Sequence, residues 1–261
     1  MEEKLKSEGK FTFIEEGEGP VLLLLHGLFG ALSNWAPVLN HFSKNYKVII
    51  PMMPIYTMPI QKSTVDGLSN YIHEFVQFKG LTNFTLIGNS LGGHVGLVYT
   101  LDHPDMVNSM ILTGSSGLYE NSIGGSYPKR QDYNFIKVRT EYTFYNPATA
   151  TKELVDEVYE IVNNRQKGLR IIMMAKSAIR HNMNKEVRHI RIPVCLIWGK
   201  NDKITPPEVA EEFDRLMPNT ELHWINECGH AAMMEKPEEF NPLAESFLRK
   251  IYPEHNLAHS K

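Results

Sequence analysis

The stretch that most constrains the fold of this chain is residues 84–94, which read FTLIGNSLGGH. It opens on an apolar run typical of a short buried strand, and the segment after the glycines is compatible with a helix. Residues 88–92 between them match G-x-S-x-G, the pattern of a sharp strand-to-helix turn with a serine at its apex. Such a turn strains the backbone of Ser90, and Gly88 and Gly92 remove the side chains that would collide around it. The pattern therefore predicts an exposed Ser90 hydroxyl at the end of a strand, with an idle serine in a glycine-rich turn as the alternative.

Strand-like and helix-like segments alternate on both sides of this turn. Strands are predicted at residues 11–14, 21–25, 46–50, 84–87, 110–114, 193–199 and 221–225. Helices are predicted at residues 34–42, 68–76, 91–101, 209–216 and 240–251. Thr205 and Glu208 fit a capping box at the start of one of these helices. The alternation predicts an α/β fold, in which a mostly parallel sheet is wrapped by helices on both faces.

The alternation stops between about residues 118 and 190, where two amphipathic helices are predicted instead. The buried face of the first is predicted to comprise Leu154, Val158, Ile161 and Val162. The buried face of the second is predicted to comprise Leu169, Ile172, Met173 and Ile179. We therefore expect a core domain made of residues 1–117 and 191–261, and a helical cap made of residues 118–190. The polar tail after Tyr252 is expected to be loose.

The composition argues against several classes of partner. Of the 261 residues 42% are hydrophobic, which is enough for one large domain with an insert. The net charge is −3 without a long basic run, which argues against nucleic acid. The N-terminal segment is charged and unlike a signal peptide, and no apolar stretch approaches the roughly 20 residues of a membrane-spanning helix. With two cysteines, too few for a disulfide framework, we expect a cytoplasmic protein without a membrane partner.

Two polar residues downstream complete a possible catalytic set with Ser90. A serine hydroxyl is a poor nucleophile unless a base takes its proton and a third group orients that base. For this type of turn the expected order along the chain is nucleophile, acid, histidine. Asp202 follows the strand at residues 193–199, and His230 follows the next strand, so both leave the same edge of a parallel sheet as Ser90. We predict a catalytic triad of Ser90, Asp202 and His230.

Other residues compete for these roles. Glu120 follows the strand at residues 110–114, where a triad acid could also lie, but an exposed loop glutamate is the favoured interpretation. His94 is expected to be a packed or solvated helix residue, and His26 a structural hydrogen-bonding residue. Cys228 lies outside any G-x-S-x-G-like strand-to-helix turn and is expected to be a small buried thiol.

Attack on a carbonyl creates an oxyanion, which fixed backbone amides stabilise well. The amide of Leu91, directly after the nucleophile, is one predicted donor. The other is the amide of Leu28, in the glycine loop that begins at His26. These are backbone roles, so the two leucine side chains are incidental to them.

These motifs together resemble the α/β-hydrolase superfamily over nearly the whole chain. The similar segments, in the order of that family, are HG at 26–27, GNSLGG at 88–93, WGKND at 198–202 and GH at 229–230. The resemblance implies an α/β-hydrolase fold with an eight-stranded sheet and a helical cap over the active site. The GNSLGG form and the cap segment are similar to the branch that contains carbon–carbon bond hydrolases of aromatic ring-cleavage products.

The chain departs from this pattern in three places. Ala231 and Ala232 follow His230, where that branch usually has a tryptophan. That branch also has an arginine in the cap, and Arg165 is its one candidate counterpart in this chain. The superfamily's usual D-x-P-G-x-G loop is replaced by the apolar residues 51–56, PMMPIY.

We therefore expect a serine hydrolase that cleaves a carboxylic ester or thioester with an apolar acyl or aryl group through an acyl-enzyme, with no metal or organic cofactor. The residues predicted to line its substrate pocket are Phe29, Met52, Met53, Met173 and Met174. One alternative is carbon–carbon hydrolysis of a ring-cleavage diketone by the same triad. Another is a ligand-binding receptor without catalytic activity on the same fold. The oligomeric state is left open.

Overall fold

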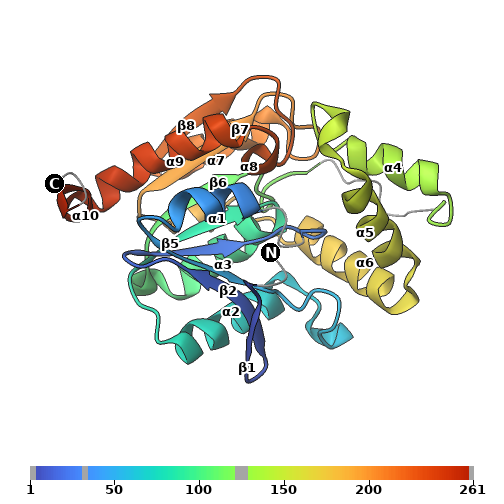
Figure 1. Cartoon of the computed structure of the whole chain (residues 1–261), viewed down its shortest axis with the longest axis horizontal. Coiled ribbons are helices and arrows are strands. Elements are labelled where there is room, and N and C mark those ends of the chain that lie inside the picture. Colours follow the sequence, from blue (N-terminus) through green and yellow to red (C-terminus); the bar gives the residue numbers. More distant parts are fainter. Residues whose placement is uncertain (1–3, 31–34, 121–128, 259–261) are drawn as a thin grey trace.

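One eight-stranded sheet runs through the structure, a computed structural model that describes residues 4–30, 35–120 and 129–258 (Figure 1). Its strands are β1 (Lys6–Glu8), β2 (Phe11–Glu16), β3 (Val21–Leu25), β4 (Lys47–Pro51), β5 (Phe84–Asn89), β6 (Val107–Thr113), β7 (Val194–Gly199) and β8 (Thr220–Ile225). Their order in the sheet is β1-β2-β4-β3-β5-β6-β7-β8. β2 pairs antiparallel with β1 and β4, and the other pairs are parallel. The predicted eight-stranded, mostly parallel sheet is confirmed.

Helices cover both faces of this sheet. The α-helices are α1 (Ala36–Phe42), α2 (Val65–Lys79), α3 (Leu91–Asp102), α4 (Tyr133–Glu141), α5 (Lys152–Asn163), α6 (Arg165–Arg180), α7 (Pro207–Leu216), α8 (Ala232–Glu235), α9 (Pro237–Ile251) and α10 (Pro253–Ala258). Short 3₁₀ helices lie at Ile60–Lys62, Pro104–Met106, Pro147–Thr149 and Val187–His189. α2, α3 and α7 pack on one face, and α1, α8 and α9 pack on the other.

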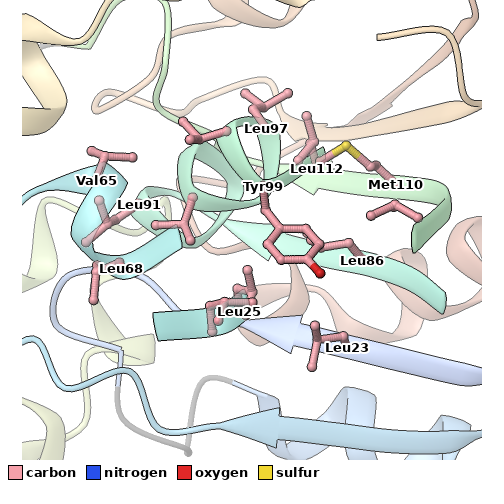
Figure 2. Packing of buried hydrophobic residues seen from close by; sticks show 14 of the residues in the cluster. Leu23, Leu25, Val65, Leu68, Leu86, Leu91, Leu97, Tyr99, Met110 and Leu112 are labelled. Carbon is pink, nitrogen blue, oxygen red and sulfur yellow. The ribbon is translucent and has the colours of Figure 1, made fainter. Parts of the chain in front are cut away.

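The apolar strands account for this two-sided arrangement. On β3, Leu23 joins the hydrophobic cluster beneath α3, while its neighbour Leu24 joins the cluster on the opposite face. Successive side chains of a strand point to opposite faces, so a strand that is apolar throughout needs cover on both sides. Tyr99 of α3 lies in the first cluster with Leu86 of β5 (Figure 2). The strand that leads to Ser90 is buried along its whole length.

α4, α5 and α6 lie in the chain between β6 and β7, and they group together at one end of the molecule (Figure 1). α5 contacts both α4 and α6. Its buried residues include Val158, Ile161 and Val162, as predicted. These helices occupy the segment where the sequence predicts an insert, and the division into a core and a cap domain at residues 118 and 190 stays a prediction. In the described part of the chain, no helix is both long and apolar enough to span a membrane.

The buried face of α6 differs from the prediction. Its buried side chains are Ile171, Met174 and Ala178. The four residues predicted to be buried are exposed instead: Leu169, Ile172, Met173 and Ile179. Apolar residues occur all round this helix, so the spacing does not identify the side that packs. The contacts of α6 with α2 and α5 determine which of its sides is buried.

Both ends of the chain contain an element that the sequence does not predict. β1 has three residues with exposed side chains, so it carries no hydrophobic pattern and forms only by pairing with β2. The tail after Tyr252 continues into α10 rather than being loose throughout. The ring centroids of His255 and Tyr46 are 5.3 Å apart, so this part of the tail packs against the core.

Leu86 offers a test of the packing beneath the site. It is a residue of β5, and its side chain is fully buried in the cluster that this strand forms with α3. We expect Leu86→Ala to lower the free energy of unfolding by about 2–5 kcal/mol, because apolar burial is lost and a cavity is left. Val138→Ala, at a position of α4 that is 61% exposed, is the control, with an expected change within about 0.5 kcal/mol. Denaturant titration measures both, and equal small changes would contradict the packing described.

Candidate active site

Ser90 lies at the sharp turn between the end of β5 and the start of α3, with φ 54° and ψ −121°. Its amide donates to the carbonyl of Thr113 at the end of β6, at 3.2 Å. Its carbonyl accepts from the amides of His94 and Ser116, each at 3.2 Å. These hydrogen bonds hold a positive φ that a residue with a side chain rarely adopts. The predicted sharp turn between strand and helix, called the elbow below, is present.

Two glycines make this turn possible. A Cβ on Gly88 would lie 2.5 Å from the Cα of Gly93, and a Cβ on Gly92 would lie 2.1 Å from the carbonyl oxygen of Leu25. The first contact is within the turn, and the second is between α3 and the end of β3. Any larger residue at either position would push the helix away from the sheet.

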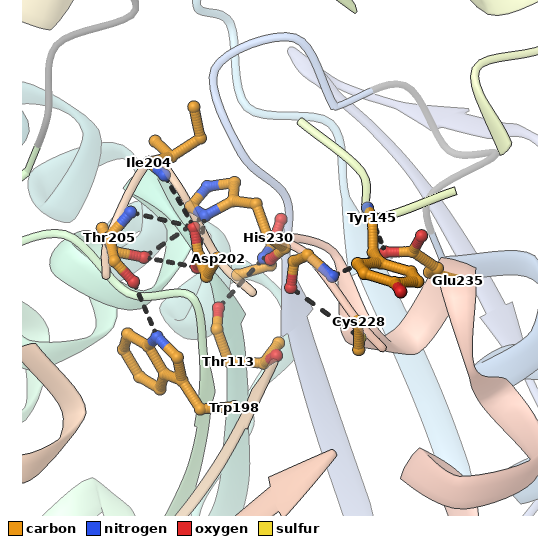
Figure 3. Close-up of polar contacts among 11 residues, drawn as sticks. Thr113, Tyr145, Trp198, Asp202, Ile204, Thr205, Cys228, His230 and Glu235 are labelled. Atoms are coloured by element: carbon orange, nitrogen blue, oxygen red, sulfur yellow. Dashed lines mark hydrogen bonds and ion pairs between the residues drawn. The ribbon is translucent and has the colours of Figure 1, made fainter. Parts of the chain in front are cut away.

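Asp202 and His230 lie on the loops that follow β7 and β8, and they meet there (Figure 3). Nδ1 of His230 is 2.9 Å from Oδ2 of Asp202. The residues are 6% and 3% exposed, so water competes little for this contact. Nδ1–H then donates to the carboxylate, which leaves Nε2 as the ring nitrogen free to accept a proton. This is the arrangement that a general base needs.

The loop of Asp202 fixes its carboxylate. Oδ1 accepts from the amides of Ile204 at 2.8 Å and Thr205 at 3.0 Å, and Oδ2 accepts from the Thr205 hydroxyl at 2.8 Å. The predicted capping box is therefore wrong: Pro206 is the N-cap of α7 and no side chain caps the helix. Thr205 is a site residue that the sequence analysis did not identify, although its spacing from Asp202 is typical of a side-chain turn.

Asn89 connects the elbow to the histidine loop. Its Nδ2 donates to the carbonyls of Thr113 at 2.9 Å and His230 at 3.2 Å. The residue before Ser90 thus positions the backbone of His230 directly. Among the described residues no hydrogen bond joins the Ser90 hydroxyl to His230, and catalytic hydrogen bonds of this kind often tighten only when substrate binds.

Ser90 and His230 both line a cavity of about 220 Å³. Leu28 and Leu91 line it too, so their amides stay candidate oxyanion donors beside Ser90. Most of the remaining wall is apolar and includes Leu154, Val158, Ile171, Ile172, Ala175 and Ile179 from α5 and α6. Such a cavity suits an apolar group attached to a carbonyl.

Of the five predicted substrate-binding residues, Phe29 and Met174 line this cavity. Met52 and Met53 do not, because they follow β4 and pack into the hydrophobic clusters on the two faces of the sheet. Met173 of α6 is exposed and does not line the cavity either. The prediction of pocket lining is therefore wrong for these three methionines.

Two charged residues of the cavity also differ from expectation. Glu120 is half-buried and lines the cavity, so it is not an exposed loop glutamate. Burial raises the pKa of Glu120, while the His230 charge and a hydrogen bond from Ser116 act in the opposite direction. Arg139 of α4 lines the cavity, whereas Arg165, at the start of α6, does not.

The rival histidines have structural contacts. Nε2 of His26 accepts from the amide of Met53 at 3.1 Å, which confirms its hydrogen-bonding role. His94 is buried, with Nε2 3.0 Å from Nδ1 of His181. Burial and the neighbouring His181 lower the pKa of His94 to about 3, so it is neutral at pH 7. Cys228 is a buried free thiol, as expected.

One group of possible metal ligands occurs among the described residues. The ligand atoms of Cys195, Glu221 and His223, on β7 and β8, all lie within 4.8 Å of one another. None of the three lines the cavity. Glu221 already pairs with Lys250 at 2.5 Å.

The fold agrees with comparisons to known proteins. Human monoacylglycerol lipase ABHD6 is 25% identical over 272 residues, which cover 94% of this chain and 79% of the lipase. The 2-hydroxy-6-oxo-6-(2'-aminophenyl)hexa-2,4-dienoic acid hydrolase of Metapseudomonas resinovorans is 27% identical over 260 residues, which cover 91% of this chain and 87% of that enzyme.

A solved structure is more similar in sequence. It is the crystal structure of MGS-MChE2, an α/β-hydrolase enzyme from the metagenome of sediments of the Mar Chica lagoon, Morocco. It is 46% identical, with a TM-score of 0.78, and the match covers 94% of this chain and 98% of that one. The family model described as "alpha/beta hydrolase fold" matches residues 20–141 and 157–237, more than half of the chain. The chain belongs to the α/β-hydrolase family.

Proposed function

We propose that this protein is a serine hydrolase that cleaves a carboxylic ester or thioester through an acyl-enzyme. The observation that carries the proposal is the buried contact between Asp202 and His230, because His230 lines the same cavity as Ser90. A histidine held by a carboxylate is the base that a serine nucleophile requires. An idle serine in a glycine-rich turn would need neither partner.

The proposed reaction proceeds in two stages. Ser90 Oγ attacks the carbonyl carbon while His230 Nε2 takes its proton, and Asp202 stabilises the charged imidazolium. The bond from carbon to the alcohol oxygen then breaks, and that oxygen takes the proton from His230. In the second stage His230 deprotonates a water, which attacks the acyl-enzyme and releases the acid and Ser90.

The amides of Leu28 and Leu91 are the proposed donors to the oxyanion that forms in both stages. Both residues line the cavity beside Ser90. Removing one donor of this kind typically costs about 3 kcal/mol of transition-state stabilisation. Because the donors belong to the backbone, side-chain substitution at these positions does not delete them.

The apolar wall from α5 and α6 supports an alkyl or aryl acyl group as the part of the substrate bound there. Carbon–carbon hydrolysis of a ring-cleavage diketone is the second candidate, and Arg139 in the cavity favours it, since an anionic dienol needs a cation. Ala231, which is too small to replace a tryptophan surface, favours the ester. A receptor without activity is the least favoured alternative.

A cytoplasmic location and the absence of nucleic-acid and membrane partners stay predictions.

The first test is Ser90→Ala. We expect it to abolish turnover of p-nitrophenyl esters, because no other hydroxyl stands at the apex of the turn, and to leave the fold intact. Ser109→Ala, at a buried serine on β6 whose hydroxyl pairs with Thr85 at 2.8 Å, is the control and should keep activity. Undiminished turnover by the purified Ser90→Ala protein would refute the assignment.

The second test separates Asp202 from Glu120 as the acid. Asp202→Asn is expected to lower kcat for a p-nitrophenyl ester by about 10⁴, because an amide at this position favours the wrong tautomer of His230. Glu120→Gln is expected to lower kcat far less. The opposite ranking of the two variants would show that the acid lies after β6.

The third test ranks the two chemistries. We expect kcat/KM to be higher for a short-chain aryl ester than for a hydroxy-oxo-dienoate, measured on one preparation. Carbon–carbon cleavage needs protonation of the substrate at carbon before attack, and Ala231 supplies no surface to orient the dienol. A clear advantage for the dienoate would reverse the ranking.

A further inference from the structure

Glu120 is the acidic side chain among the residues that line the cavity, and the reaction proposed above does not use it. It lies on the loop after β6, which is fixed to the end of α6. The carbonyl of Leu118 accepts from Asn182 Nδ2 at 2.6 Å, and the carbonyl of Gly117 accepts from the amide of Met183 at 2.7 Å. These hydrogen bonds fix the backbone just before Glu120, whose side chain lines the cavity.

This carboxylate has spare capacity to accept hydrogen bonds. Among the described residues, its donor is the hydroxyl of Ser116. None of the ion pairs among the described residues includes Glu120, although Arg139 and Lys176 line the same cavity. A carboxylate offers about four lone pairs, and a desolvated one without enough partners costs free energy. A donor on the bound molecule would satisfy it.

The position of His230 identifies the part of the substrate that Glu120 faces. Both residues line the cavity, and the loop after β6 that carries Glu120 lies against His230, since a Cβ on Gly114 would be 2.9 Å from Nδ1 of His230. In the proposed reaction His230 gives its proton to the leaving alcohol, so groups beside His230 border that alcohol. The acyl group occupies the apolar wall of α5 and α6 instead.

We propose that Glu120 determines specificity for the leaving group, by accepting a hydrogen bond from a donor on the alcohol part of the ester. Preferred substrates are then esters whose alcohol carries a second hydroxyl or a protonated amine. The inference rests on the proposed ester hydrolysis. Asp202 already occupies Nδ1 of His230, so Glu120 has no orienting role toward that nitrogen.

Two matched pairs of esters test this proposal. Hydroxyethyl butyrate is compared with propyl butyrate, and dimethylaminoethyl butyrate with isopentyl butyrate, so that each pair differs in a hydrogen-bond donor but little in size. For the wild-type protein we expect kcat/KM to favour the donor-bearing ester of at least one pair by roughly tenfold to a hundredfold. The pair that responds distinguishes a hydroxyl from an ammonium group.

Substitutions then assign the preference to Glu120. Glu120→Leu is expected to bring the ratio of kcat/KM within the responding pair close to one, and Glu120→Gln to an intermediate value, because an amide oxygen still accepts but carries no charge. Glu157→Gln is the matched control, since Glu157 of α5 is also half-buried and its pKa is also raised by burial, but it does not line the cavity. It should leave both ratios as in the wild type. Thermal unfolding of each variant verifies that it is folded.

Three outcomes would overturn the proposal. A wild-type ratio near one in both pairs would show that no donor on the alcohol is recognised. If Glu120→Leu and Glu120→Gln lower kcat/KM by the same factor for both esters of a pair, Glu120 acts through His230 rather than on the alcohol. Turnover of none of the four esters by the wild type would refute the proposed function together with this inference, whereas turnover without discrimination refutes the inference alone.

Discussion

The left-handed backbone of Ser90 is the constraint on which the rest of the site depends. A residue with a side chain in this conformation costs on the order of 1–3 kcal/mol, and it persists only where its surroundings hold it. Here the hydrogen bonds to Thr113 and from Ser116 tie the turn to the end of β6. The close approach of Gly92 to Leu25 ties it to β3. The strained turn is thus held by the three central strands β3, β5 and β6, and the burial of these strands offsets its free-energy cost.

The same sheet edge explains how residues far apart in the chain meet. β5, β7 and β8 run parallel, so their C-terminal ends lie along one edge, and they are followed by Ser90, Asp202 and His230 respectively. Asn89 then bridges the elbow to the His230 loop, and Thr205 fixes Asp202 from within its own loop. These groups are therefore held mainly by the loops at the edge of the sheet. One further hydrogen bond comes from the segment after α4, where the carbonyl of Thr143 accepts from the amide of His230 at 2.9 Å.

This division explains which features the sequence predicts. The strands and the elbow follow from local patterns, namely apolar runs and a glycine spacing that one backbone conformation requires. The buried face of α6 and the destinations of Met52 and Met53 do not, because an apolar side chain packs equally well in a core or in a cavity and only distant segments decide between them. Thr205 is missed for a related reason: its spacing fits a helix cap, and the nearby carboxylate of Asp202 competes for the same hydroxyl.

In the proposed reaction, selectivity for the substrate and reactivity depend on different parts of the molecule. The loop that carries Glu120 is held by hydrogen bonds from the Asn182 side chain and the Met183 amide, just after α6, to the carbonyls of residues 117–118. α6 also carries much of the apolar wall. α6 and the segment just after it, which hydrogen-bonds to the Glu120 loop, therefore contribute to both the apolar and the polar wall of the cavity. A family built on one sheet can in this way change its substrates without rebuilding its catalytic groups.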